Sequence, residues 1–340
     1  MNLARTQARP LAVGITLSVA ALPAVAHHGV AGLGAASLEG PGAPIEQSSS
    51  ATLPKGKTFT YFKVDYADWK TYTSATDDEA DYSAYWMPGL GYGVTPWLSL
   101  YAFLPYHDKV DEDGFFNTHG WADASVNATL GFKYDDGFRR IPDNESLDDL
   151  EDWRFTLYTG LTLPTGNPNL RDRDGNIDKG KSTGFGEPTF TLGATASKML
   201  NERWTLNFDI ANLWFQEHTY DADPAHGSTK FTGQFGDEFR VNTAAIYKAY
   251  TNPEQRFRLD LLGELNYLYL GRDKEDGVAE RATGGHILYL TPGVRAYWNN
   301  LSIAFGVKWP IATDLNEEDE QQGAEGKENY RLIFSISALF

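Results

Sequence analysis

The chain has 340 residues and a formal net charge of −17, with 29 Lys and Arg against 46 Asp and Glu. Such an acidic balance argues against a nucleic-acid partner, because phosphate backbones are bound by clustered basic side chains. Aromatic residues make up 14% of the chain and Cys is absent, which suits a protein that crosses an oxidising compartment before it folds.

The first 26 residues have the three parts of a secretory signal peptide. Arg5 and Arg9 supply the positive charge, an apolar run follows at 11–22, and Ala-Val-Ala at 24–26 is a small-residue cleavage site. The run is too short to cross a bilayer as a helix, and no later segment reaches the roughly 18 apolar residues that a transmembrane helix needs. We therefore expect an exported protein that begins at His27.

Residues 27–52 are rich in Gly, Ala and Ser and have no periodicity of either kind. Such a segment would be disordered by itself. We interpret it as a separate N-terminal segment, which lies either in the periplasm or inside the rest of the fold as a plug.

From residue 53 to 340 the chain alternates apolar and polar side chains with the period of two that is typical of half-buried strands. Each stretch has about the length that a tilted membrane strand needs. The twelve predicted strands are residues 58–69, 82–94, 97–106, 121–134, 153–164, 187–199, 204–215, 239–250, 257–270, 287–298, 301–311 and 330–340.

The connections between these strands alternate in character. They are short after the second, sixth, eighth and tenth strands, and longer, polar and acidic after the odd-numbered ones; only 135–152 is long where a short turn is expected. Short periplasmic turns and long extracellular loops are typical of outer-membrane barrels. The predicted fold is all-β: a 12-stranded antiparallel transmembrane β-barrel, an up-and-down meander, in the outer membrane of a Gram-negative bacterium.

The last strand supports this interpretation. Leu332, Phe334 and Ile336 share one face, Arg331 lies on the other, and the chain ends on Phe340. This ending resembles the final strand of bacterial outer-membrane barrels, so we expect Phe340 to be recognised by the barrel insertion machinery and the apolar face to contact lipid. Four tryptophans at the periplasmic strand ends read as an interfacial girdle: Trp97, Trp153, Trp204 and Trp298.

The faces that point away from lipid carry charges of both signs. Two interpretations stand: ion pairs that brace the wall, or a polar conduit that selects a solute. The predicted lumen-lining residues are Lys63, Asp65, Asp123, Lys133, Arg154, Glu187, Asp209, Glu238, Arg240, Lys248, Arg258, Asp260, Glu264, Arg295, Lys308 and Arg331.

Two places have the composition of a divalent-cation site, although no cofactor is expected. Asp172, Asp174, Asn176 and Asp178 have the spacing of a calcium loop, but its twelfth position is Thr183 and not Glu. His27 and His28 would place two imidazoles beside a free amino terminus. The outer acidic loops also have the composition of ordinary solvated loops, or of loops that hold lipopolysaccharide through divalent cations.

Several short motifs carry a family resemblance: 90–95 (Leu-Gly-Tyr-Gly-Val-Thr), 104–106 (Leu-Pro-Tyr), 163–166 (Leu-Pro-Thr-Gly), 184–188 (Gly-Phe-Gly-Glu-Pro) and 291–295 (Thr-Pro-Gly-Val-Arg). With these motifs, most of the mature chain resembles the "MetA-pathway of phenol degradation" family of outer-membrane transporters. The resemblance implies passage of small, often aromatic or hydrophobic compounds. Relatives with a His-His-Gly start resemble proteins of heavy-metal handling.

The expected function is an outer-membrane channel or transporter for a small solute. The alternative is a closed structural or metal-binding barrel linked to heavy-metal handling. An enzyme in the barrel would need Ser, His and an acid together at the outer rim, and the sequence places no such set there.

Overall fold

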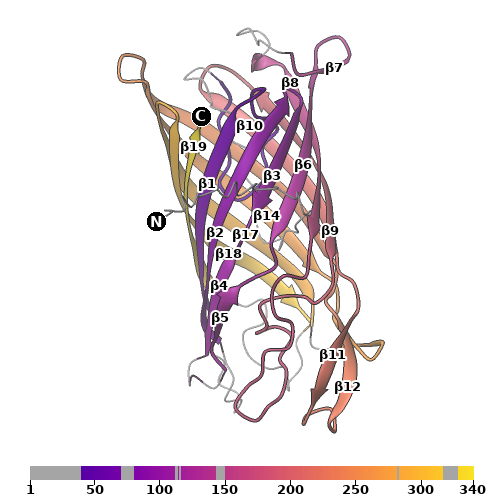
Figure 1. Ribbon diagram of the computed structural model, residues 1–340. Coiled ribbons are helices and arrows are strands. Elements are labelled where there is room, and N and C mark those ends of the chain that lie inside the picture. Colours follow the sequence, from indigo (N-terminus) through magenta and orange to yellow (C-terminus); the bar gives the residue numbers. More distant parts are fainter. Residues whose placement is uncertain are drawn as a thin grey trace, which may run out of the picture.

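The structure is a computed structural model that describes residues 40–69, 80–111, 114, 116–142, 150–281, 283–316 and 328–340. The predicted twelve-stranded antiparallel barrel is confirmed, with the strands tilted along one tall cylinder (Figure 1). The predicted signal peptide, His27 and His28 lie outside the described residues. The wall consists of β1 (Thr58–Trp69), β2 (Ala80–Thr95), β3 (Leu98–Phe103) with β4 (Tyr106–Asp111), β5 (Thr118–Trp121) with β6 (Ser125–Tyr134), β8 (Trp153–Thr162), β9 (Thr189–Met199), β10 (Trp204–Trp214), β13 (Glu238–Asn252), β14 (Phe257–Leu270), β17 (Gly285–Trp298), β18 (Leu301–Leu315) and β19 (Glu328–Leu339).

The first and last strands close the ring. β1 pairs with β2 on one side and with β19 on the other, in a register that sets Phe59 opposite Leu339. At the seam the Phe340 N–H donates to the Thr58 carbonyl at 2.8 Å, and the Thr58 N–H donates back to the Phe340 carbonyl at 3.1 Å. Closure leaves no strand edge to be satisfied by water, which is the condition for a sheet to sit in lipid.

The two faces of the wall differ as the alternation predicts. On β14, Leu261, Leu265 and Tyr269 point outward and are 40–46% exposed, whereas Arg258 and Asp260 point inward and are at most 1% exposed. Exposed aliphatic and aromatic side chains recur on β6, β8, β9, β10, β17, β18 and β19 as well. An outward apolar belt of this kind is well solvated by the lipid of a bilayer and poorly solvated by water.

The sequence predicts 97–106 and 121–134 as unbroken strands, and this is wrong in detail. The pairing breaks at Leu104-Pro105, and β4 then continues to Asp111, beyond the predicted end; likewise β5 begins before residue 121, and a break at 122–124 separates it from β6. Pro105 has no N–H for the ladder, so the pairing cannot continue through it. The Ala122 N–H donates instead to the Pro105 carbonyl at 2.8 Å, which keeps the two breaks side by side.

The two ends of the barrel are unequal. Turns 200–203, 253–256 and 299–300 lie at one end, here called the short-turn end; the loops 163–188, 215–237 and 271–284 lie at the other, the long-loop end. At the long-loop end β11 (His218–Asp223), β12 (Thr229–Gln234), β15 (Lys274–Glu275) and β16 (Val278–Ala279) form a separate four-stranded sheet. Figure 1 shows the β11–β12 hairpin projecting from the barrel there.

The long connection 135–152 contains β7 (Phe138–Arg140), which pairs with β6. Figure 1 shows β7 at the same end of the barrel as the C-terminus. None of the helical turns in the described ranges has the length and apolarity to cross a bilayer.

Candidate functional site

Most of the charges predicted to face the lumen are deeply buried. Thirteen of the sixteen are in the buried class, and Glu187, Arg240 and Lys248 are half-buried. Many of them are paired: Arg258 contacts Asp260 at 2.6 Å, and Arg331 contacts Asp65 at 3.0 Å and also Glu328. Paired charges in a low-dielectric interior avoid the large cost of an isolated ion.

Residues 40–53 pass among these inward side chains at the short-turn end. Glu46 of this segment is 3% exposed and accepts from Lys63 at 2.8 Å and from Lys308 at 2.7 Å. Because β1 and β18 supply the two lysines, one carboxylate bridges strands that β19 separates in the wall. We call residues 40–53 the lumen segment.

Side chains of the wall also hold the backbone of the lumen segment. The Glu264 carboxylate accepts from the N–H groups of Ile45 at 2.5 Å and of Glu46 at 3.2 Å. Arg258 and Arg295 donate to the carbonyls of Gly40 and Pro44, each at 2.6 Å. A segment without secondary structure must find partners for its backbone polar groups, and here charged wall residues supply them.

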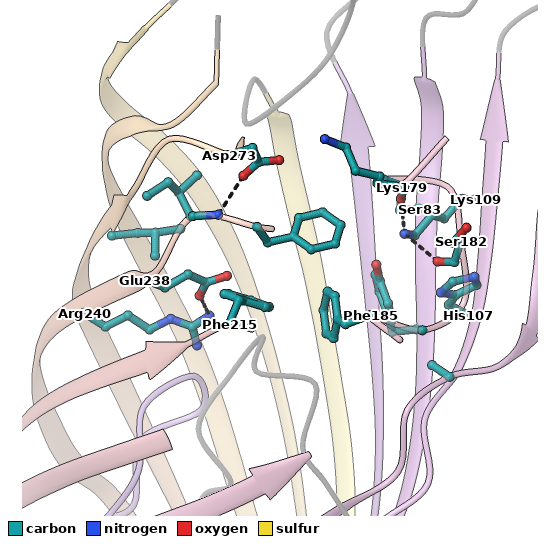
Figure 2. Close-up of a pocket in the computed structure, with 18 of the residues that line it drawn as sticks. Ser83, His107, Lys109, Lys179, Ser182, Phe185, Phe215, Glu238, Arg240 and Asp273 are labelled. Atoms are coloured by element: carbon teal, nitrogen blue, oxygen red, sulfur yellow. Dashed lines mark hydrogen bonds and ion pairs between the residues drawn. The ribbon is translucent and has the colours of Figure 1, made fainter. Parts of the chain in front are cut away.

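Beyond the lumen segment, toward the long loops, the barrel encloses a cavity of about 980 Å³. Its lining includes many aromatic side chains, among them Phe185, Phe215 and Phe235. The ring of Phe185 lies 4.9 Å from that of Phe215 and 5.1 Å from that of Phe235, in edge-to-face geometry. Figure 2 shows Phe185 and Phe215 between the wall that carries Glu238 and Arg240 and the side that carries His107 and Lys109. An enclosed space lined by aromatic side chains, with polar groups that can fix a ligand's orientation, is a usual form of a small-molecule site.

Loop 163–188 lies across this end of the barrel, and we call it the strap. On one side Lys109 of β4 donates to the carbonyls of Gly180 and Ser182, and Lys181 pairs with Asp111. The Thr118 hydroxyl of β5 donates to the Lys181 carbonyl at 2.6 Å. The strap is therefore anchored to the wall through β4 and β5.

On the other side the strap joins the separate sheet. Lys179 contacts Glu280 at 2.5 Å and Glu275 at 3.4 Å, and the Ile177 N–H donates to Asp223 at 2.9 Å. Ile177 packs with Tyr220 and Phe231 in a small buried cluster. These contacts make the strap and the β11–β12 hairpin one cover over the cavity.

His226 is the best-connected histidine of this cover. Its Nδ1 lies 2.6 Å from Asp223, its Nε2 lies 3.0 Å from Glu275, and its ring stacks on Phe231 at 3.6 Å. Burial lowers the pKa of His226, but the hydrogen bonds and charges of Glu275 and Asp223 outweigh it and raise the pKa above 6.5. His286, by contrast, lies on the outer face, where it is hydrogen-bonded to Tyr267 at 2.7 Å.

The residues of the predicted calcium loop use their oxygens internally. Asp172 accepts from the N–H groups of Asp174 and Asn176, each at 2.8 Å, and Asp178 accepts from the Gly180 N–H at 2.7 Å. Among the described residues no group of three or more His, Asp and Glu side chains has the arrangement of a metal site. Cation binding at this loop and at His27 and His28 remains a prediction.

Sequence reasoning missed the aromatic lining and the strap. Phe185 stands between two glycines in a polar loop, and a large apolar residue in such a setting is a usable signal. Phe215 ends the predicted strand 204–215 and has the parity of its inward residues, whereas Phe235 lies just outside β12, where no periodicity marks it. The lysines Lys109, Lys179 and Lys181 have no pattern that reveals their partners.

Neither a scan of protein-family models nor a search of curated proteins finds a match. Among solved structures, the COG4313 outer membrane channel from Pseudomonas putida F1 is similar with a TM-score of 0.63 and 17% identity, over 86% of this chain and 98% of that one. The beta domain of the Bordetella autotransporter BrkA has a TM-score of 0.43 and 11% identity, over 84% of this chain and 99% of that one. The Pseudomonas putida toluene transporter TodX has a TM-score of 0.37 and 11% identity, over 92% of this chain and 98% of that one. At these identities the first similarity establishes the fold, and the other two add nothing to it.

Proposed function

We propose that the protein is an outer-membrane channel for a small, largely apolar or aromatic solute. The observation that carries the proposal is the cavity of about 980 Å³ with aromatic walls, enclosed between the lumen segment and the strap. Aromatic side chains line the empty space together with charged ones, so the cavity offers contact area to an apolar body and polar groups that can orient it. The solute would enter from the long-loop end, which we assign to the outside of the cell, and would leave past the lumen segment.

The fold shared with the Pseudomonas channel and the exposed apolar belt support a place in the outer membrane. In that place the partners would be membrane lipid, lipopolysaccharide at the acidic loops, and the insertion machinery at Phe340, which is 62% exposed. The same fold supports the resemblance to the "MetA-pathway of phenol degradation" transporters. The proposal assigns no catalysis: both ring nitrogens of His226 contact carboxylates, and His286 faces outward.

A second candidate is a closed structural barrel, favoured by the number of buried hydrogen bonds that hold the lumen segment. The two candidates differ in what happens when that segment is removed. A channel lacking residues 40–52 should pass ions freely, while a barrel braced by its own ion pairs should stay shut.

The test is uptake of an aromatic probe, 2-phenylethanol, into liposomes that contain the refolded protein. Uptake above that of protein-free liposomes, reduced by Phe185→Trp, which fills part of the cavity, would support the channel. Uptake equal to that of lipid alone, both for the whole chain and for the variant without residues 40–52, would refute it.

A further inference from the structure

Three of the buried acidic side chains in the described part of the chain form no ion pair: Asp123, Glu264 and Asp209. Two of them are satisfied by backbone N–H groups. Asp123 accepts from Gly166 at 2.7 Å and from Phe185 at 2.8 Å, and Glu264 accepts from the lumen segment. These two carboxylates therefore have a structural explanation.

Asp209 has a weaker set of partners. It is 5% exposed, and its two oxygens accept from the Tyr158 hydroxyl and the Asn242 amide, each at 2.8 Å. Both donors are neutral, and a carboxylate has room for about four hydrogen bonds. The nearest arginine along the neighbouring strand, Arg240, attracts Asp209 electrostatically but forms its ion pair with Glu238. A buried carboxylate without a cation is costly unless something else supplies the positive charge.

The position of Asp209 along β10 is informative. The inward residues of β10 come in the order Thr205, Asn207, Asp209 from the short-turn end. Thr205 accepts from the Gly42 N–H at 3.0 Å, and Asn207 donates to the Ser48 carbonyl at 2.9 Å, so both hold the lumen segment. Asp209 is the next inward residue, and it lines the cavity. Its carboxylate thus stands on the floor of the cavity, where the open space meets the lumen segment.

The surroundings of the cavity favour a cation. Its lining carries ten acidic and six basic side chains, so its charge is negative as a whole. An enclosed site of one sign concentrates solutes of the opposite sign. The aromatic faces of the lining attract cations as well.

We propose that Asp209 binds the ammonium group of a small amphiphilic amine, whose apolar body occupies the aromatic cavity. The proposal rests on the proposed function, because it names the class of solute that the cavity takes. An ammonium group brings three N–H donors and one positive charge, which are what Asp209 lacks. A neutral alcohol of the same shape brings one donor and no charge, and so serves as the comparison.

Binding of 2-phenylethylamine and of 2-phenylethanol to the detergent-solubilised protein at pH 7 tests the proposal by calorimetry. The amine is protonated at this pH. We expect it to bind about tenfold more tightly than the alcohol, since a hydrogen bond to a charged group is stronger than a neutral one. Asp209→Asn should remove this preference and leave alcohol binding within about twofold, while Asp209→Glu should keep most of the preference.

Asp221→Asn, which removes an exposed carboxylate from the β11–β12 hairpin, is the control and should change neither affinity. Equal affinities for the amine and the alcohol in the parent protein would overturn the proposal, even if Asp209→Asn does not fold. So would an equal loss of both ligands in Asp209→Asn.

Uptake of the same two probes into liposomes separates the two proposals. If the amine binds with the predicted preference but neither probe enters, the channel function fails and the Asp209 site stands. If the alcohol enters and the amine has no preference, the channel stands and the Asp209 site fails.

Discussion

The two ends of the barrel bury polar groups in different ways. At the short-turn end, charged wall residues meet the backbone and Glu46 of the lumen segment, and the interior is filled. At the long-loop end, the polar groups of the strap and the separate sheet pair with each other and with the wall above the cavity, and the interior stays open. The same alternating strands build both ends. What differs is whether a chain segment enters the barrel or lies across it.

This difference suits the two ends of the barrel to different roles toward a solute. The long-loop end offers space and aromatic contact area, so it suits binding. The short-turn end is closed by many short, buried, charge-assisted hydrogen bonds, so it suits control of passage. In the proposed channel, a solute that binds at the long-loop end would still have to displace or move contacts at the short-turn end.

The largest effect on the difference between the two ends is expected from Glu46→Ala. It removes the carboxylate that Lys63 and Lys308 share; Lys63 keeps Asp65 at 3.1 Å, but Lys308 loses its carboxylate, and breaking such a buried pair costs about 3–5 kcal/mol. We expect the lumen segment to undock and the short-turn end to become as open as the other. Planar-bilayer conductance should rise well above the parent value, and Glu254→Ala on an exposed turn should not change it. An unchanged conductance would show that the segment stays in place without its charge.

A second substitution, Asp273→Asn, acts on the cover of the long-loop end. Burial raises the pKa of Asp273 to about 6, although the Gly236 N–H and Lys179 oppose this. Because the folded state holds the proton more tightly than the unfolded state, stability falls as pH rises from about 4 to about 6. Asp273→Asn keeps an oxygen for the Gly236 N–H and should add up to about 2 kcal/mol at pH 7.5, and little at pH 4.

The measurement for Asp273→Asn is the midpoint of thermal unfolding in detergent at both pH values. Asp276→Asn, in the neighbouring turn, serves as the control, and its exposed carboxylate should show no such pH-dependent gain. A loss of stability at pH 7.5 would mean that the charge of Asp273 holds Lys179 and is needed.

Phe185→Ala tests whether the solute binds in the cavity at the long-loop end. It removes the ring that contacts both Phe215 and Phe235, so the affinity for 2-phenylethanol should fall roughly tenfold. Phe190→Ala, on the outward face of β9 and 47% exposed in the parent, removes a ring of the same size and should leave the affinity unchanged. Titration calorimetry of both variants decides the matter, and equal losses would place the binding site elsewhere.

The smallest effect concerns His226. Its raised pKa means that the protonated ring stabilises the cover fully below pH 6.5 and that this contribution is lost as pH rises through the raised value. Proteolytic cleavage of the β11–β12 hairpin should be a few times faster at pH 8.5 than at pH 6, since a partly exposed pair contributes less than about 1 kcal/mol. His226→Gln should abolish the difference and His286→Gln should retain it.

Most of the wall could be predicted from the sequence. β1 and β14 have the predicted boundaries, because apolar and polar side chains alternate over 62–66 in β1 and over 257–261 and 264–267 in β14. The division at Leu104-Pro105 could also have been predicted, since Pro excludes a ladder hydrogen bond, but the apolar run before it concealed it.

The site was less predictable. Alternation shows that Lys63, Glu264 and Lys308 point inward, but it does not identify their partners. The two lysines pair with Glu46, and Glu264 accepts from backbone N–H groups of the lumen segment. For Glu264 and Lys308 these partners lie more than 200 residues away in the sequence. The lumen segment has no periodicity, so its position follows only from these contacts. The β11–β12 hairpin was hidden for a related reason: its buried cluster draws on Ile177 of another loop.

The seam between Thr58 and Phe340 has a consequence for unfolding. Leu53, which donates its N–H to Ser99 at 2.7 Å, ends the lumen segment only five residues before that seam. The segment's other partners lie on β1, β10, β14, β17 and β18, so its contacts exist only while the whole ring is intact. Opening β1 from β19 would therefore release the lumen segment in the same step, and the barrel should lose its closure and its filling as one cooperative unit.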